Sequence, residues 1–278
     1  MVPSKHIAAS DFGGYISAGT MAPHCRKFVA VSFTCSLVAA SGPAIAAGCS
    51  FEPQGEGRVA AVIDARSFRL EDGREVLLAG IEPAESEQKK NISALSAIVA
   101  GRELKLSGPD DTPDRYGRQP AFGFLDPSQP SVQAQLLAQG AALVSGSVTD
   151  RDCAALLAAA EATGRAAKQG VWADPAAIKN TESPGDILAG IGRFMVVEGK
   201  VLSVRQAGAT TYLNFGRNWT HDFAVTISRR MLPAFEAAGI VLKSLENRQI
   251  RVRGWVESRT GPRIEALHVG QIEVLGGS

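Results

Sequence analysis

The last third of the sequence combines aromatic and arginine side chains in a pattern that suits single-stranded nucleic acid. The aromatic residues are Tyr212, Phe215, Trp219, Phe223 and Trp255, and Arg217, Arg251 and Arg253 lie among them. Aromatic rings stack on bases, and cations follow the phosphates. Alternate aromatic residues also fill cores, and we expect this of Tyr212 and Phe223. Residues 216–220 read as a loop, so Trp219 and Arg217 are the candidate binding residues.

Several other kinds of active site have no counterpart in the sequence. His221 and His268 are far apart, and the cysteines and histidines lack the spacing of a metal site. Neither a P-loop nor a serine nucleophile motif occurs. The net charge of +1 gives no reason by itself to expect a nucleic-acid or membrane partner. The sequence therefore gives no support to those enzyme classes.

The middle of the chain reads as a small barrel with helices. Strand patterns cover residues 57–63, 67–70, 75–81, 102–107 and 119–125, and helical patterns cover 93–99, 131–139 and 152–169. A hairpin turn at 71–74 joins the second and third strands. This order predicts a mainly β, α+β fold in which helices pack against a closed barrel.

Four motifs in this segment resemble the staphylococcal nuclease (thermonuclease, SNase-like or TNase-like) family. They are residues 62–70, residues 72–85, residues 114–118 and residues 161–172, in the family's order. The resemblance implies an SNase-like OB-fold barrel over residues 49–175. It also implies a family activity, the calcium-dependent hydrolysis of phosphodiester bonds in DNA or RNA.

The resemblance assigns most of the family's functional positions. In that family, carboxylates and a carbonyl hold calcium, a glutamate acts as general base, and two arginines clamp the phosphate. Asp64 and Glu82 match metal-binding acids, Glu85 matches the general base, and Arg118 matches one clamp. Ordinary solvated acids, and an arginine that braces its own loop, are the alternative interpretation of these residues.

Two positions depart from the family pattern. Arg66 stands where a further metal ligand is expected, and Leu77 stands where the other arginine is expected. A guanidinium repels a divalent ion, because unit charges 4 Å apart interact by about 4 kcal/mol at an effective dielectric constant of about 20. Losing one preorganised donor costs about 3 to 4 kcal/mol of barrier. We therefore expect no bound metal and no hydrolysis, with Arg66 paired to Glu82 or Glu85.

Three functions remain open from the sequence. The first is a non-catalytic, exported SNase-like protein that binds nucleic acid, protein or another anionic polymer. The second is an active nuclease that uses Glu85 and Arg118, with calcium at an altered site of Asp64 and Glu82. The third is a structural or docking protein of the cell envelope, in which the C-terminal module makes the contacts.

The C-terminal part reads as a second module. Strand patterns cover residues 195–206, 210–215, 222–227, 249–258, 263–268 and 271–275, and a helix is expected at 228–238. Three strands, a helix and further strands predict a second small OB-like β-barrel at 193–278, after a linker at 176–192. Charge separates the two parts, because residues 49–175 hold 13 Lys and Arg against 18 Asp and Glu, and residues 176–278 hold 13 against 9. The oligomeric state stays open.

The N-terminal segment has the order of a secretory signal. Arg26 and Lys27 precede an apolar run from residue 28 to about residue 40, and the small-residue stretch 44–47 follows. The run is shorter than the roughly 20 residues that a membrane span needs. We therefore expect residues 21–47 to be a signal peptide, the protein to be periplasmic or secreted, and residues 1–20 not to belong to the native chain.

Two of the four cysteines, Cys25 and Cys35, would leave with that signal peptide. Cys49 and Cys153 remain, and an even pair in an oxidising compartment predicts a disulfide. The alternative is a lipoprotein processing site, in which Cys49 carries a lipid and cannot pair.

Overall fold

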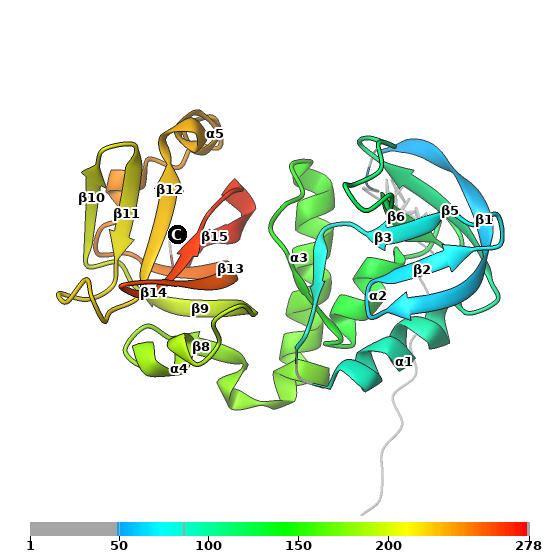
Figure 1. The fold of residues 1–278 in the computed structure, drawn as a ribbon, viewed down its shortest axis with the longest axis horizontal. Helices are drawn as coiled ribbons and strands as arrows, with labels where there is room; N and C mark the ends of the chain where they lie inside the picture. Colours follow the sequence, from blue (N-terminus) through cyan, green and yellow to red (C-terminus); the bar gives the residue numbers. More distant parts are fainter. Residues whose placement is uncertain (1–48, 50, 86, 277–278) are drawn as a thin grey trace, which may run out of the picture. The chain divides into compact units, whose positions relative to one another are not determined.

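The computed structural model describes residue 49, residues 51–85 and residues 87–276. These residues fall within one compact unit, Ile45–Ser278, and the other unit, Met1–Ala44, lies outside them. They form a mixed α+β structure, mostly sheet, with five α-helices (Figure 1). The predicted signal peptide and residues 1–20 also lie outside the described residues.

The first sheet is a closed barrel. Its strands, in order around the ring, are β1 (Glu52–Asp64), β2 (Ser67–Leu70), β3 (Glu75–Leu78), β6 (Gln119–Phe124) and β5 (Glu103–Gly108). Only β3 and β6 run parallel; the other neighbours are antiparallel. β1 is long enough for its first part to pair with β5 and its second part with β2, which closes the ring. Phe68, Val76, Leu104 and Phe122 fill the interior.

Three helices pack on this barrel: α1 (Gln88–Val99), α2 (Val132–Ala138) and α3 (Arg151–Ala166). α2 begins at Ser131, whose side chain accepts a hydrogen bond from the Ala134 N–H, and Asp150 caps α3 in the same way through the Cys153 N–H. The helices place Leu95, Leu136 and Leu157 in the barrel core. In the part of the chain that the structure describes, no helix has the length and apolar character to span a membrane.

A disulfide joins Cys49 to Cys153, across 104 residues of sequence. The predicted pair is confirmed, and its sulfur atoms link the segment before β1 to the first turn of α3. A cross-link over about 100 residues stabilises a fold by about 4.7 kcal/mol in the chain-entropy treatment. Because the Cys49 sulfur is engaged in this bond, it cannot carry a thioether-linked lipid.

The segment predicted as one strand at 75–81 is divided in two. β3 ends at Leu78, and the chain turns through Gly80 (φ 81°) into β4 (Ile81–Pro83), which pairs with β7 (Ala142–Val144) outside the barrel. A Cβ at Gly80 would lie 2.7 Å from the Val148 side chain, so glycine is required for this close approach. The turn carries Glu82 away from the barrel wall to its edge.

The second sheet has eight strands. Its main path runs β10 (Ser203–Ala207), β11 (Thr210–Asn214), β12 (Ala224–Ser228), β14 (Gly261–Glu265), β13 (Gln249–Arg259), β9 (Phe194–Lys200) and β8 (Ile178–Asn180), and β15 (Ile272–Val274) also pairs with β13. α4 (Pro184–Leu188) and α5 (Leu232–Ala237) contribute Ile187 and Phe235 to its core. β8 and α4 lie in the segment 176–192 that the sequence predicts to be a linker. The domain boundaries stay a prediction.

The predicted second barrel is an open sheet instead. From β10 to β9 its strands nevertheless pair as in the first ring, antiparallel except for the parallel pair of β12 and β14, and the added edge strand β8 also runs parallel to β9. The counterpart of β1 is interrupted at Val201 and Leu202, so that β9 pairs with β13 and β10 pairs with β11. At this break the Val201 N–H donates a hydrogen bond to Arg248 O, just before β13, and the Leu202 N–H donates one to Asn214 O, at the end of β11. The path stays open because two short strands replace one continuous strand.

A buried ion pair joins the second sheet to α3. Arg253 of β13 lies 2.9 Å from Glu161 of α3, and the two side chains are only 6% and 3% exposed. The Arg253 guanidinium also donates to Val144 O, and Glu161 accepts from Val144 N–H. Nearby, a small cluster of Leu143, Trp172, Phe194 and Val196 is buried. These contacts therefore fix β13 and β9 of the second sheet against β7 and α3.

We expect Arg253→Met to lower the free energy of unfolding by about 3 to 5 kcal/mol, because it leaves a buried carboxylate without its cation. Adding Glu161→Gln should restore part of that loss, since the amide oxygen still accepts from Val144 N–H. Urea unfolding with the disulfide intact measures both. Arg69→Met is the control, because the Arg69–Glu75 pair is exposed and worth at most about 1 kcal/mol. Equal losses in Arg253→Met and Arg69→Met would contradict this role.

Candidate functional site

The candidate site lies at the edge of the closed barrel where β1 ends and β4 begins. Asp64 is the last residue of β1, and its Oδ1 accepts a hydrogen bond of 2.8 Å from the Arg66 backbone N–H. Glu82 is the middle residue of β4 and lies opposite Leu143 of β7. The tight connection from β1 to β2 and the pairing of β4 with β7 therefore place both acids.

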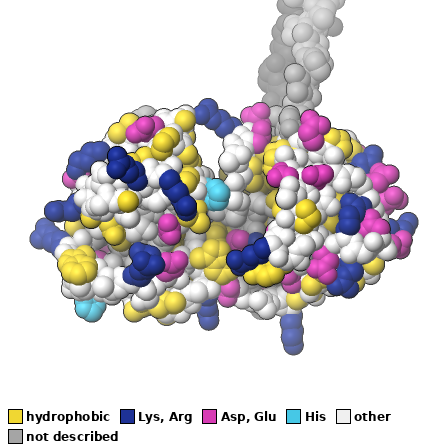
Figure 2. Space-filling model, turned by 45° about the horizontal axis from the view of Figure 1, so that its top comes forward, with side chains coloured by type: hydrophobic (Ala, Val, Ile, Leu, Met, Phe, Trp, Pro, Cys, Tyr) yellow, Lys and Arg dark blue, Asp and Glu magenta, His cyan; other side chains and the backbone are white. Residues whose placement is uncertain are grey.

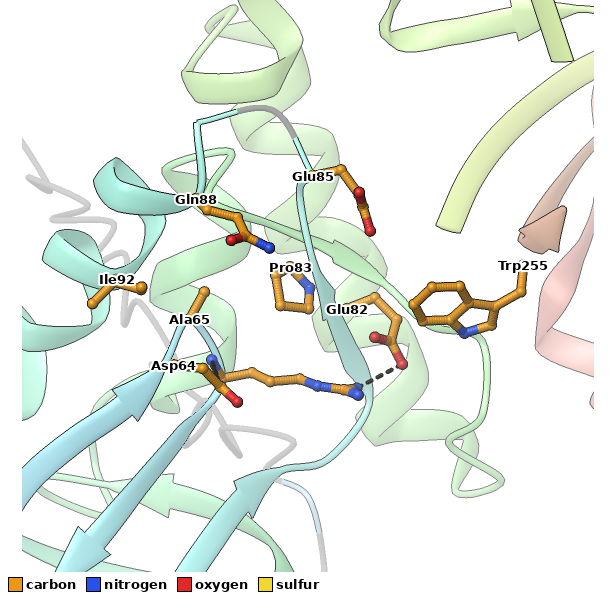
Figure 3. A pocket seen from close by; sticks show the side chains of 9 residues that line it. Asp64, Ala65, Glu82, Pro83, Glu85, Gln88, Ile92 and Trp255 are labelled. Carbon is orange, nitrogen blue, oxygen red and sulfur yellow. Dashed lines mark hydrogen bonds and ion pairs between the residues drawn. The ribbon is translucent and has the colours of Figure 1, made fainter. Parts of the chain in front are cut away.

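Arg66 fills the space between these strands with its guanidinium. Its Nη1 lies 2.6 Å from Glu82 Oε1 and donates to Ile81 O at 3.2 Å. The Arg66 and Glu82 side chains are 24% and 13% exposed, so the pair is largely shielded from water. This contact, drawn as the dashed line in Figure 3, confirms the predicted pairing of Arg66 with an acid. Glu82 is neutralised by a residue of its own chain.

Burial raises the pKa of Glu82 above its ordinary value, because it removes water from the charged carboxylate. The nearby charge of Arg66 and its hydrogen bond lower the pKa and only partly offset burial, and Arg118 makes a smaller contribution in the same direction. A carboxylate that is already costly to ionise beside one arginine is a poor partner for a divalent cation. Asp64, Arg66 and Glu82 as arranged do not fit a calcium ion.

Glu85 lies beyond β4 and is exposed. Its Oε2 is 3.8 Å from Nε of Arg193, which directly precedes β9 of the second sheet. Figure 3 shows the Glu82 and Glu85 carboxylates on the side of β4 where Trp255 lies. Glu85 thus lines the same pocket as Asp64 and Glu82. Its ion-pair partner, Arg193, comes from the segment just before β9.

Arg118 is held in its own loop instead of the pocket. Its Nε and Nη2 donate to Asp114 Oδ2 at 2.9 and 2.7 Å, and its guanidinium lies 5.2 Å from the centre of the Tyr116 ring. Leu77, at the other predicted clamp position, is a half-buried residue of β3 opposite Ser67 and Pro120. Neither position offers a free guanidinium to a phosphate.

The acids line a cavity of about 210 Å³. The lining residues are Asp64, Ala65, Arg66, Glu82, Pro83, Glu85, Gln88, Ile92 and Trp255 (Figure 3). Trp255 comes from β13, and the sequence does not mark it as part of this site. The alternation of core and non-core residues along β13 indicates its position, because Ile250, Val252 and Val256 enter the core of the second sheet. The residues between them, including Trp255, therefore face the other way.

The predicted nucleic-acid residues are divided by the structure. Trp219 is 71% exposed, Arg217 is exposed, and Phe223 is buried as expected. Tyr212, expected in the core, is half-buried and lines a separate cavity of about 320 Å³ together with Trp219. That expectation was wrong because β11 turns Thr211 and Leu213 to the core and Tyr212 to the other face.

Two arginines of the sequence pattern are not available to a ligand. Arg251 and Arg253 are both buried, and Arg251 pairs with Glu198 and Glu273 at 2.6 and 2.8 Å. Burial lowers the pKa of Arg251, but the hydrogen bonds and charges of those two glutamates outweigh it and raise the pKa overall. These two arginines of the pattern therefore stabilise the structure.

Among the described residues, no group of three or more His, Cys, Asp and Glu side chains is arranged to hold a metal ion. Comparison of the chain with protein-family models and with curated proteins finds no match. The function is therefore inferred from the pocket at the end of β4 and from the exposed face of the second sheet.

Millimolar calcium should leave the melting temperature of the protein unchanged, because an ion that does not bind the native state cannot stabilise it. The double change Arg66→Asp with Leu77→Arg should make the melting temperature rise with calcium, since it replaces the guanidinium beside Glu82 with a carboxylate and moves the positive charge to the predicted clamp position on β3. Differential scanning calorimetry measures both. Arg69→Asp with Leu77→Arg is the matched control, because it makes the same net charge change but leaves Arg66 in the pocket and places the new acid on β2. A calcium-dependent rise in the unmodified protein would contradict the predicted loss of the metal site.

Proposed function

We propose that this chain is an exported, non-catalytic protein of the thermonuclease (SNase-like) family that binds its target without hydrolysing it. The closed barrel is then the family's OB-fold, and the second sheet is an OB-like barrel whose first strand is interrupted. The single observation that carries the proposal is the Arg66–Glu82 ion pair, 2.6 Å long, at the position where the family resemblance places calcium.

Family membership is supported by the order of the motifs and by the order of the strands. The motifs at 62–70 and 72–85 form β1 to β4, and the motif at 114–118 forms the loop before β6. A three-stranded meander followed by a parallel pairing of β3 with β6 is the strand order expected of a five-stranded OB barrel. The same pairings recur in the second sheet.

Loss of hydrolysis follows from charge and geometry. A guanidinium near a divalent ion costs about 4 kcal/mol at 4 Å and an effective dielectric constant of about 20. The phosphate clamps are also missing, since Leu77 has no charge and Arg118 is held by Asp114. The alternative, an active nuclease, would require Arg66 to leave Glu82 and Arg118 to leave Asp114 before a phosphate could be bound.

Export is supported by the disulfide, which is compatible with a periplasmic or secreted protein. The signal-like order of residues 21–47 also supports export. In such a compartment the protein would meet nucleic acid released from cells and the other envelope proteins. A structural or docking role in the envelope is the remaining alternative, and the exposed residues below separate it from nucleic-acid binding.

The exposed face of the second sheet is the part suited to nucleic acid. Trp219 projects from the loop between β11 and β12, and the cavity beside it is also lined by Tyr212, Arg259 and Arg263. Figure 2 shows mostly basic side chains over one half of the molecule and mostly acidic ones over the other, in line with the charges of the two segments. A ring with nearby cations suits stacked bases and phosphates, and the acidic pocket repels them.

We expect the protein to cleave neither single- nor double-stranded DNA with calcium, in an assay that includes Glu85→Ala as the inactive reference. It should bind a fluorescent single-stranded oligonucleotide. Trp219→Ala should weaken that binding by about 5-fold to 150-fold, the equivalent of 1 to 3 kcal/mol for one stacked base. Trp255→Ala is the matched control, because it removes the exposed tryptophan of the acidic pocket instead.

Calcium-dependent cleavage that Glu85→Ala abolishes would contradict the non-catalytic function. Oligonucleotide binding that is absent, or is equally weakened by both tryptophan changes, would contradict the binding face and favour the docking role. Fluorescence anisotropy measures the binding of the oligonucleotide. Repeating it at a second salt concentration tests for phosphate contacts, because these weaken as salt rises.

A further inference from the structure

The pocket at the end of β4 is completed by an aromatic wall from the other sheet. The Trp255 ring meets the Phe194 ring edge to face at 6.0 Å, and Trp255 is nevertheless 47% exposed. In Figure 3 the indole extends from β13 toward Glu82, across the opening between the strands. A large apolar ring left half-exposed and fixed beside acids is not needed for the core of either sheet.

The position of Trp255 follows from the buried ion pair described above. Arg253 lies two residues earlier on β13, so both side chains leave the same face of the strand. Arg253 is fixed by Glu161 and Val144. Trp255 is therefore presented to the acids by a strand that is anchored to the first part of the chain, and the pocket needs both sheets.

The charges in the pocket favour a cation. The lining holds three carboxylates, Asp64, Glu82 and Glu85, against one guanidinium, Arg66, which gives a formal charge of −2. Arg66 is engaged by Glu82 at 2.6 Å, so the charges of Asp64 and Glu85 remain for a ligand. Arg193, at 3.8 Å from Glu85, is largely exposed, and water screens its charge.

The cavity is small, with a volume of about 210 Å³, and it has room for one small organic group. An anion would meet net negative charge, and a bare divalent ion would meet the Arg66 guanidinium. An organic cation can place its charge beside the carboxylates and its carbon atoms against the indole face.

We propose that this pocket binds an alkylammonium or guanidinium group, as carried by lysine and arginine side chains or by free polyamines, through Trp255, Glu85 and Asp64. The inference rests on the proposed non-catalytic function, since it requires that metal and phosphate are not bound there. It extends that function, because the chain then holds two separate binding places, one for a cation and one for a nucleic acid.

The test uses the disulfide-bonded protein and follows the indole N–H resonances in a ¹⁵N-correlated NMR spectrum. The probes are Nα-acetyl-arginine amide, Nα-acetyl-lysine amide and spermidine. Nα-acetyl-citrulline amide is the matched neutral control, because it has nearly the shape of the arginine derivative without its charge. Thymidine monophosphate is the anionic control. Comparison with Trp255→Leu assigns the Trp255 resonance.

The cationic probes should shift the Trp255 resonance saturably, and citrulline and the nucleotide should not. Trp255→Leu should weaken the binding, measured by calorimetry, by about 2-fold to 30-fold, the range of one cation–π contact. Glu85→Gln should weaken it and reduce its dependence on salt. Trp219→Leu should leave it unchanged. Thermal melts of the variants establish that each is folded, and the contrast between arginine and citrulline needs no variant.

A citrulline derivative that binds as well as the arginine derivative, or a nucleotide that binds in their place, would overturn the inference. So would the absence of any saturable shift. Tighter binding of an arginine-containing peptide than of spermidine assigns the site to a polypeptide partner, and the reverse order assigns it to a polyamine. Calcium-dependent DNA cleavage would contradict the proposed function itself, whereas a protein that neither cleaves DNA nor binds the cations contradicts this inference alone.

Discussion

The buried contact between Arg253 and Glu161 is the interaction on which the arrangement of the site depends. Arg253 lies in β13, which pairs with β9, β14 and β15, and Glu161 lies in α3, which packs on the closed barrel. Removing two such charges from water costs several kcal/mol for each ion, and only close contact with further hydrogen bonds offsets that cost. Val144 supplies both a donor and an acceptor to the pair. β13 of the second sheet is therefore fixed against α3 and β7, and residues of β1, β4 and β13 can line one pocket.

The repeated strand order explains how two dissimilar surfaces arise from one kind of pairing. In the closed barrel β1 is continuous, and its end at Asp64 opens directly into the pocket. In the second sheet the corresponding strand is interrupted at Val201, and β8 adds to the edge of β9. The loop between β11 and β12 then carries Trp219 into solvent. One part presents a small acidic cavity, and the other presents an aromatic residue with arginines.

Much of the fold is predictable from local sequence, because strand alternation and capping residues act over a few positions. β2 occupies the predicted residues 67–70, and α3 begins within one residue of its predicted start. The Cys49–Cys153 disulfide and the pairing of Arg66 with an acid were also predictable, the first from compartment and number, the second from charge. Predicting these features requires only the identity of the residues and knowledge of which strands are adjacent.

The rest depends on contacts that are distant in sequence. The turn at Gly80 that makes β4 a separate strand is set by close approach of Val148 and Leu157. The burial of Arg253 could not be predicted, because its partner, Glu161, lies 92 positions earlier. Trp255 could not be placed in the pocket without knowing that β13 faces the end of β4. Sequence patterns identify which face of a strand is polar, but not what that face meets.

The pocket holds three acids, but not in the metal arrangement that the resemblance to thermonuclease implies, and this gives it a different chemistry. Arg66 supplies internally the positive charge that a metal would supply, and Trp255 closes the space with an apolar ring. Under our proposals, a site built in this way binds small organic cations in preference to phosphates. The face of the second sheet that we propose for nucleic acid is separate from this pocket, because Trp219, Arg259 and Arg263 line another cavity.

A crystal structure of the disulfide-bonded protein, grown with millimolar calcium, tests the central claim most directly, because it locates both the ion and the Arg66 side chain. We predict that Arg66 remains in contact with Glu82, that no calcium lies between Asp64 and Glu82, and that Trp255 forms the wall of the same pocket. A calcium ion bound by Asp64 and Glu82, with Arg66 turned away from them, would contradict it.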